Sequence, residues 1–548
     1  MFYTFFFLVG MCRAAFSGAD IPNEYREPAN FDLTLTFIKG INPYSTEVLE
    51  GDVPGCVFQY GPAFSLLAAG VHFILPFVDI FVLHYIIALI CILAAAVMAA
   101  VIAHENSETL LPASCVFLFT IACTWRYGYI NAVPDTLGVT ILVLVFFVET
   151  RRRIPGREYI EAALAVLLLY TKQYFVIIAF SLFVYKLITD ARACIRLSVA
   201  GMALLALSVA VINRTCPLYF TYTLLIVHGV SGQSVAQSHP LFSNINLMHL
   251  VSSVYSEASV TELPPTGWAF EALQLRSLIS IFLFVFAGML AGIIKAFIQR
   301  TPSFACSRLF VIHSATAFAA LLFLGQNDGA WLSYYLELLM PPVVIYSFIS
   351  AEKNALDENM AKTAKLASSV LLMFMVMYTT YRMDARLGYF EKSSEARAVW
   401  DKGYAYCEAS AKKGEILYRA PMGLNALAAG RYLYDNGHEM AIHQRFLDEY
   451  NNTKTYQWLF PYAGRLMKQH IDYREKMRDK IAGREYSLVM KTATDEDAEE
   501  FVSTGFLEEH GYVKMDSLNL DMGWAFYEVE FWVPADKAEL PLEATGTV

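Results

Sequence analysis

Three carboxylates lie close together near the start of the chain: Glu24, Glu27 and Asp32. They occupy a polar segment between the apolar run at 2–11 and a long series of apolar runs. At a membrane surface, such a carboxylate can act as a general base that deprotonates an acceptor hydroxyl. Acidic residues just ahead of a helix, predicted here at 28–39, also stabilise its N-terminal end without any catalysis. The residues alone leave both interpretations open.

A second group of polar residues flanks the later apolar runs. These are Arg126, Asp135, Lys172, Gln173, Asp328, Tyr335 and Glu337. Arginine and lysine at headgroup depth can neutralise a lipid phosphate and stabilise the charge that develops when it leaves. Each residue also has a structural interpretation: Arg126 as an interfacial anchor, Asp135 as a helix N-cap and Glu337 as a partner of a neighbouring helix. Lys172 lies in a tight hairpin between two apolar runs, where a purely structural role is harder to justify.

The composition is that of a polytopic helical membrane protein. Of the 548 residues, 56% are hydrophobic and only 17% are charged, whereas a soluble protein carries roughly a quarter charged residues. The net charge of −10 comes largely from the C-terminal part and argues for a solvated domain there and against nucleic acid. The nine cysteines show no metal-binding spacing.

The apolar runs predict eleven membrane crossings, provided that the short run 62–77 lies on the membrane surface. The first is 2–11, which lacks the basic start of a signal peptide and resembles the outer part of an incomplete helix. The others are 79–103, 111–125, 136–150, 159–170, 173–187, 195–212, 275–294, 309–324, 332–349 and 366–381. This arrangement keeps Arg151–Arg153 inside and places the acidic segment and the C-terminus outside.

The chain divides, on this reading, into a membrane region over 1–383 and a soluble outer domain over 384–548. Three stretches of the second part are predicted as strands, at 415–419, 486–491 and 527–533. Helices are predicted at 422–429 and 438–479. The predicted fold class is therefore a polytopic all-α membrane protein followed by a small α/β domain.

Five short motifs on the predicted outer side together resemble a known family. In order they are Gly40-Ile-Asn-Pro-Tyr44, Tyr60-Gly-Pro62, Arg126 with Pro134-Asp-Thr-Leu137, Thr171-Lys-Gln173, and Tyr335-Leu-Glu-Leu338. The order is similar to that of the GT-C superfamily of integral-membrane glycosyltransferases. The bacterial branch akin to protein mannosyl-, aminoarabinose- and lipopolysaccharide-core sugar transferases resembles the chain most.

The resemblance implies a polyprenyl-phosphate-sugar donor, an inverting transfer and a catalytic carboxylate in the first outer loop. By position, Glu27 matches the base best and Glu24 comes next. Many members have an Asp or an Asp-Glu pair there, whereas this chain has Glu-x-x-Glu. The assignment therefore stays between Glu24, Glu27 and Asp32.

These inferences predict a hexosyl- or pentosyltransferase that acts on a glycan, lipid or protein acceptor at the outer face of a membrane, preferably a bacterial cytoplasmic membrane. Lys172 and Arg126 would hold the donor phosphate. The pocket would be shaped by Tyr44, Tyr60, Gln173, Asp328, Tyr335 and Glu337. The first loop can also hold a divalent metal, although no ligand spacing predicts one. The alternative is a transporter or flippase of lipid-linked glycans, which predicts ionisable residues at mid-membrane and two related halves.

Overall fold

A computed structural model gives the fold, and it divides the chain into two compact units. The first comprises 1–17, 60–211 and 227–387, and the second comprises 18–59, 212–226 and 388–548. The described residues are 9–10, 12, 26–51, 58, 60–107, 109–124, 133–151, 154–226, 307–324, 337–353, 362–363, 365–370, 373, 377, 394–419, 460–492, 502–521 and 526–537.

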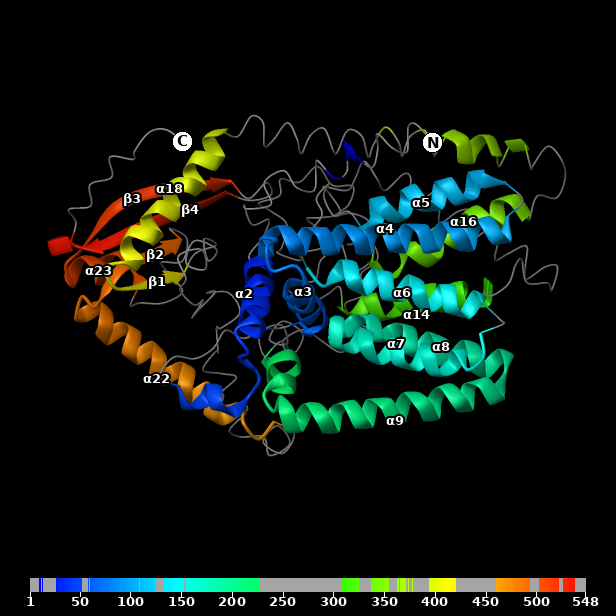
Figure 1. Ribbon diagram of the computed structural model, residues 1–548, viewed down its shortest axis with the longest axis horizontal. Helices are drawn as coiled ribbons and strands as arrows, with labels where there is room; N and C mark the ends of the chain where they lie inside the picture. Colours follow the sequence, from blue (N-terminus) through cyan, green and yellow to red (C-terminus); the bar gives the residue numbers. More distant parts are fainter. Residues whose placement is uncertain are drawn as a thin grey trace. The chain divides into compact units, whose positions relative to one another are not determined.

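The first unit is a bundle of apolar helices, most of which run side by side (Figure 1). They are α3 (Ala63–Ile74), α4 (Ile80–Asn106), α5 (Leu110–Thr124), α6 (Asp135–Thr150), α7 (Arg157–Thr171), η3 (Gln173–Val176), α8 (Ile177–Thr189), α9 (Ala191–Thr215, whose last turn belongs to the second unit), α14 (Ser307–Leu324) and α16 (Met340–Lys353). Within this unit, α4 packs against α5, α6 and α16, while α8 packs against α14.

The helices coincide with the predicted crossings wherever those crossings are described. Two of them, α4 and α9, are long and apolar enough to cross a membrane by length and composition. The predicted crossing 275–294 lies outside the described residues, as does most of 366–381, so the number of crossings stays a prediction. Helix α3 is only 12 residues long, about 18 Å at the helical rise, which is too short to span.

The second unit contains a four-stranded sheet with the order β1-β2-β4-β3. Its strands are β1 (Glu415–Arg419), β2 (Tyr486–Thr492), β3 (Tyr512–Asp521) and β4 (Phe526–Pro534). Strands β1 and β2 are parallel, and the other pairs are antiparallel. Three of these strands were predicted, whereas β3 was missed because charged and polar residues interrupt its alternation and a register shift between Lys514 and Asp516 breaks its period.

Helices cover both faces of this sheet. Helix α18 (Ser394–Ala411) lies on one face, where Tyr406 contacts Phe531. Helices α22 (Ala463–Ala482) and α23 (Thr504–Glu509) cover the other, in a core that includes Met477, Leu507 and Trp532. Helix α22 corresponds to the last part of the predicted helix 438–479 and ends three residues beyond it. The predicted helix 422–429 lies outside the described residues.

The second unit also contains the first-loop segment. Helix α2 (Arg26–Ile38) agrees with the helix predicted at 28–39, and Gly40 follows it with a positive φ of 73°. The short helices η1 (Thr46–Glu50), η4 (Thr221–Ile226) and η8 (Ala535–Lys537) complete the described elements of this unit. Its buried residues include Phe31, Leu33 and Tyr44.

Candidate active site

Lys172 is at the centre of a buried polar cluster in the helical bundle. It lies between the end of α7 and the start of η3, and its side chain is 1% exposed. Its ammonium donates to the carboxylate of Asp135 across 2.6 Å. Asp135 is the first residue of α6, and Pro134 occupies the N-cap, so the prediction that Asp135 is an N-cap is wrong. The carboxylate instead balances a buried cation.

Two tyrosine rings face the Lys172 ammonium. The ring centres of Tyr60 and Tyr174 lie 4.7 and 5.0 Å from Nζ, distances at which the ring quadrupole attracts a cation. The next residue, Gly61, passes so close to α7 that a Cβ there would lie 1.8 Å from the Tyr170 carbonyl oxygen. A glycine is therefore required at this turn, and the Tyr60-Gly-Pro62 motif brings the first ring to Lys172.

Glu337 joins the cluster from a distant part of the chain. Its side chain is buried, and its carboxylate accepts a short hydrogen bond from the Tyr174 hydroxyl. That hydroxyl also lies 3.4 Å from Asp135. The structure thus unites Tyr60, Asp135, Lys172 and Glu337, which the sequence had suggested, and adds Tyr174 as a direct partner. Tyr174 was missed because a tyrosine in an apolar run gives no distinctive signal.

The first-loop carboxylates belong to the other compact unit. Asp32 lies in α2, and its side chain is buried. Burial raises the pKa of Asp32 to about 7, an effect that the positive charge of Lys39 partly opposes. A carboxylate with this pKa is suited to accept a proton near neutral pH. Glu27 lies in the first turn of α2, and its side chain, like the whole of Glu24, lies outside the described residues.

Tyr44 is a core residue of the second unit. Its ring packs edge-on against Tyr219 at 5.4 Å and Phe58 at 6.3 Å. Its carbonyl accepts a hydrogen bond of 2.9 Å from the amide of Leu218. The Asn-Pro-Tyr turn is tied to the same segment, because the Asn42 side chain donates to the Thr215 carbonyl at 2.6 Å.

Of the remaining predicted site residues, the structure describes only Gln173. Gln173 is half-buried at the start of η3, next to Lys172. Arg126, Asp328 and Tyr335 lie outside the described residues. Among the residues that the structure describes, no group of three or more histidines, cysteines and carboxylates is placed to hold a metal ion.

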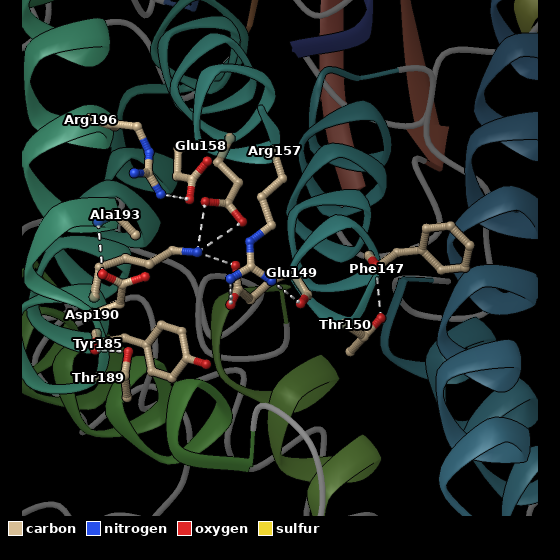
Figure 2. Close-up of polar contacts among 12 residues, drawn as sticks. Phe147, Glu149, Thr150, Arg157, Glu158, Tyr185, Thr189, Asp190, Ala193 and Arg196 are labelled. Atoms are coloured by element: carbon tan, nitrogen blue, oxygen red, sulfur yellow. Dashed lines mark hydrogen bonds and ion pairs between the residues drawn. The ribbon is translucent and has the colours of Figure 1, made fainter. Parts of the chain in front are cut away.

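A second buried cluster joins four helices at the other end of α6 (Figure 2). Lys186 of α8 contacts the carboxylates of Glu149 on α6 and Glu161 on α7, the latter at 3.2 Å, and all three side chains are at most 1% exposed. Arg157 approaches Glu149 to 3.5 Å. Figure 2 also shows Arg196 of α9 reaching Glu158 of α7, with a distance of 2.9 Å.

The two clusters are arranged alike. In both, a carboxylate of α6 pairs with a lysine 37 positions later in the sequence. The partners at one end are Asp135 and Lys172, and those at the other are Glu149 and Lys186. Since roughly 14 helical residues separate the two carboxylates, the clusters lie about 21 Å apart along α6.

The fold of the chain is similar to that of two solved glycosyltransferases. ArnT from Cupriavidus metallidurans, in a crystal structure bound to undecaprenyl phosphate, is similar with a TM-score of 0.53, 11% identity and 97% coverage of both chains. The Archaeoglobus fulgidus oligosaccharyltransferase in its apo form gives a TM-score of 0.52 at 12% identity, over 93% of this chain and 72% of the other.

These similarities establish the fold, as the sequence motifs predicted. No protein-family model and no curated protein matches the sequence. At 11–12% identity, the similarity concerns the fold alone.

Proposed function

We propose that the protein is a membrane glycosyltransferase that moves a sugar from a polyprenyl-phosphate donor to a glycan, lipid or protein acceptor. In this proposal residues 1–383 form the membrane region and 384–548 an extracytoplasmic domain, and the reaction takes place on the outer side of a bacterial cytoplasmic membrane. The observation that carries the proposal is the buried Lys172 cluster, with a cation, two carboxylates and two tyrosines, in a GT-C fold.

The proposed reaction is a single displacement at the anomeric carbon. The acceptor hydroxyl oxygen forms a bond to C1 of the sugar while the bond from C1 to the phosphate oxygen breaks, which inverts the configuration. The hydroxyl proton passes to a first-loop carboxylate, Glu27, Glu24 or Asp32. The raised pKa of Asp32, about 7 because of burial, gives it a property that suits this role.

Lys172 is proposed to hold the departing phosphate together with Arg126. A lysine ammonium has three N–H donors, and Asp135 accepts one of them. When the donor binds, its phosphate draws the ammonium toward itself, and fixed positive charge then stabilises the leaving group. Tyr60 and Glu337 shape this end of the pocket, and Tyr44, Gln173, Asp328 and Tyr335 complete the proposed lining.

The test is binding of a radiolabelled polyprenyl-phosphate sugar to the detergent-purified protein. Lys172→Met is expected to weaken binding at least about ten-fold, since a hydrogen bond to a charged group contributes roughly 1.5–3 kcal/mol. The matched control is Lys186→Met/Glu161→Gln, which also removes a buried paired lysine but keeps its cluster balanced in charge, and it should bind as the wild type does. Equal loss in both variants would remove Lys172 from the donor site. No binding by the wild type across a panel of such lipids would instead favour the transporter or flippase.

A further inference from the structure

The segment that carries Glu337 has a defect in its helical hydrogen bonding. In an α-helix, the carbonyl of a residue accepts from the N–H four positions later. The residues four positions after Glu337 and Leu338 are Pro341 and Pro342, and proline has no N–H. The regular pattern resumes one residue later, where Val343 donates to the Leu339 carbonyl at 3.3 Å.

His313 supplies a donor at this position. It lies in α14 with its ring fully buried, and its Nε2 is 3.1 Å from the Leu338 carbonyl oxygen. A carbonyl oxygen only accepts, so Nε2 carries the proton. The side chain of His313 therefore replaces the N–H that Pro342 lacks.

Two further contacts fix the orientation of this ring. The Nδ1 atom of His313 lies 3.0 Å from the hydroxyl of Ser181 on α8, and the Thr316 hydroxyl lies 2.6 Å from the same oxygen. With the proton on Nε2, Nδ1 is an acceptor for the Ser181 hydroxyl, which also lies 2.9 Å from the Ile177 carbonyl. The ring also packs edge-on against Phe146 of α6 at 5.4 Å. Helices α6, α8 and α14 together hold one histidine tautomer against Leu338.

We infer that His313 is a positioning residue for Glu337: by hydrogen bonding to the Leu338 carbonyl, it holds the proline-interrupted turn that presents Glu337 to Tyr174. His313 acts through the backbone, because the carbonyl that it contacts belongs to the residue directly after Glu337. The carboxylate is thereby kept within reach of the Tyr174 hydroxyl, which also lies beside Asp135 and so links Glu337 to the Lys172 cluster. The inference rests on the proposed function only for its consequence in donor binding.

The test removes the hydrogen-bond donor of His313 and then supplies a backbone N–H in its place. His313→Phe keeps a ring for Phe146 but loses Nε2–H. Pro342→Ala returns an N–H at the position that a regular helix would use. We expect His313→Phe to weaken the binding of undecaprenyl phosphate to the full-length protein in detergent by about ten-fold, as for a buried carbonyl left without a donor. The His313→Phe/Pro342→Ala variant should bind within about three-fold of the wild type.

A second measurement follows Glu337 itself, without any donor lipid. Labelling by a hydrophobic carbodiimide, read at Glu337 by mass spectrometry, should change in rate at least about three-fold in His313→Phe and return in the double variant. A contribution of His313 to packing alone would not be rescued by Pro342→Ala. Two labelling results would overturn the inference. In one, His313→Phe is labelled at Glu337 at the wild-type rate; in the other, the double variant is labelled at the same altered rate as the single variant. If the wild type binds no lipid while labelling follows the expected pattern, the proposed function fails and the inference stands.

Discussion

Removal of the Lys186 ammonium should destabilise the helical bundle strongly. Lys186, Glu149 and Glu161 are at most 1% exposed, so none of their charges is solvated by water. With Arg157, which lies 3.5 Å from Glu149, the set contains two basic and two acidic side chains and is neutral when all four are ionised. Lys186→Met leaves one negative charge without compensation inside the bundle. Breaking a buried ion pair in this way costs about 3–5 kcal/mol, and the remaining contact of Arg157 with Glu149 places the expected loss near the lower limit, ~3 kcal/mol.

A second variant tests whether the unbalanced charge causes the loss of stability. Lys186→Met/Glu161→Gln restores neutrality, because Glu149 keeps Arg157 and the second carboxylate is gone. We expect the double variant to recover to within about 1 kcal/mol of the wild type. As a control, Glu105→Gln removes a partner of Arg151 in a pair whose side chains are 39% and 31% exposed, and it should cost under about 1 kcal/mol.

The assay is equilibrium unfolding in mixed micelles with increasing SDS, followed by circular dichroism and by limited proteolysis. The variants Lys186→Met, Lys186→Met/Glu161→Gln and Glu105→Gln are compared at the same detergent composition. A loss below about 1 kcal/mol for Lys186→Met, or a double variant no more stable than the single one, would refute the reasoning from buried charge.

Two further predictions concern packing and pH. Gly138→Ala would place Cβ 2.2 Å from the Phe175 ring and should cost about 1–3 kcal/mol of stability. Adding Phe175→Leu should recover part of that loss in the same unfolding assay. In Gly61→Ala the new Cβ meets the backbone carbonyl of Tyr170, so no side-chain substitution should rescue it. The pKa of Asp32 is raised in the folded protein from 3.8 to about 7 because of burial, so the folded state binds this proton more tightly. Its contribution is fully present below pH 4 and is lost as the pH rises to about 7, a change of about 4 kcal/mol at most. Asp32→Asn should abolish that slope in unfolding measured from pH 4 to 8, and an unchanged slope would assign the pH dependence to other groups.

Much of the fold was accessible from hydropathy and spacing. The apolar runs that become α4 to α9 and α14 end within a few residues of their predicted limits. The Tyr60-Gly-Pro62 and Thr171-Lys-Gln173 motifs converge on one site. These features are local or nearly so, and a residue pattern of period 3.6 or a turn signal is sufficient to find them.

The partners within the site could not be predicted in the same way. Pairing of Asp135 with Lys172 depends on how α6 lies against the α7–η3 junction, and a single sequence contains no record of that contact. Pro134 predicts a helix start at Asp135, and α6 does begin there. The Asp135 carboxylate, however, accepts a hydrogen bond from Lys172. His313 lies in an apolar run with no neighbouring polar motif. Its role becomes visible only when the proline at 342 and the Leu338 carbonyl are seen beside it.

The two clusters at the ends of α6 differ in composition. The set around Lys186 contains two basic and two acidic side chains, and each is paired by a contact that crosses between helices. The set around Lys172 contains, among the described residues, the two carboxylates of Asp135 and Glu337 and one ammonium, together with tyrosine hydroxyls and rings. Perturbed buried carboxylates of this kind are typical of functional sites. The contacts around Lys186 tie α6, α7 and α8 together, and we propose that the Lys172 end is the one where binding of a charged ligand changes the pairing.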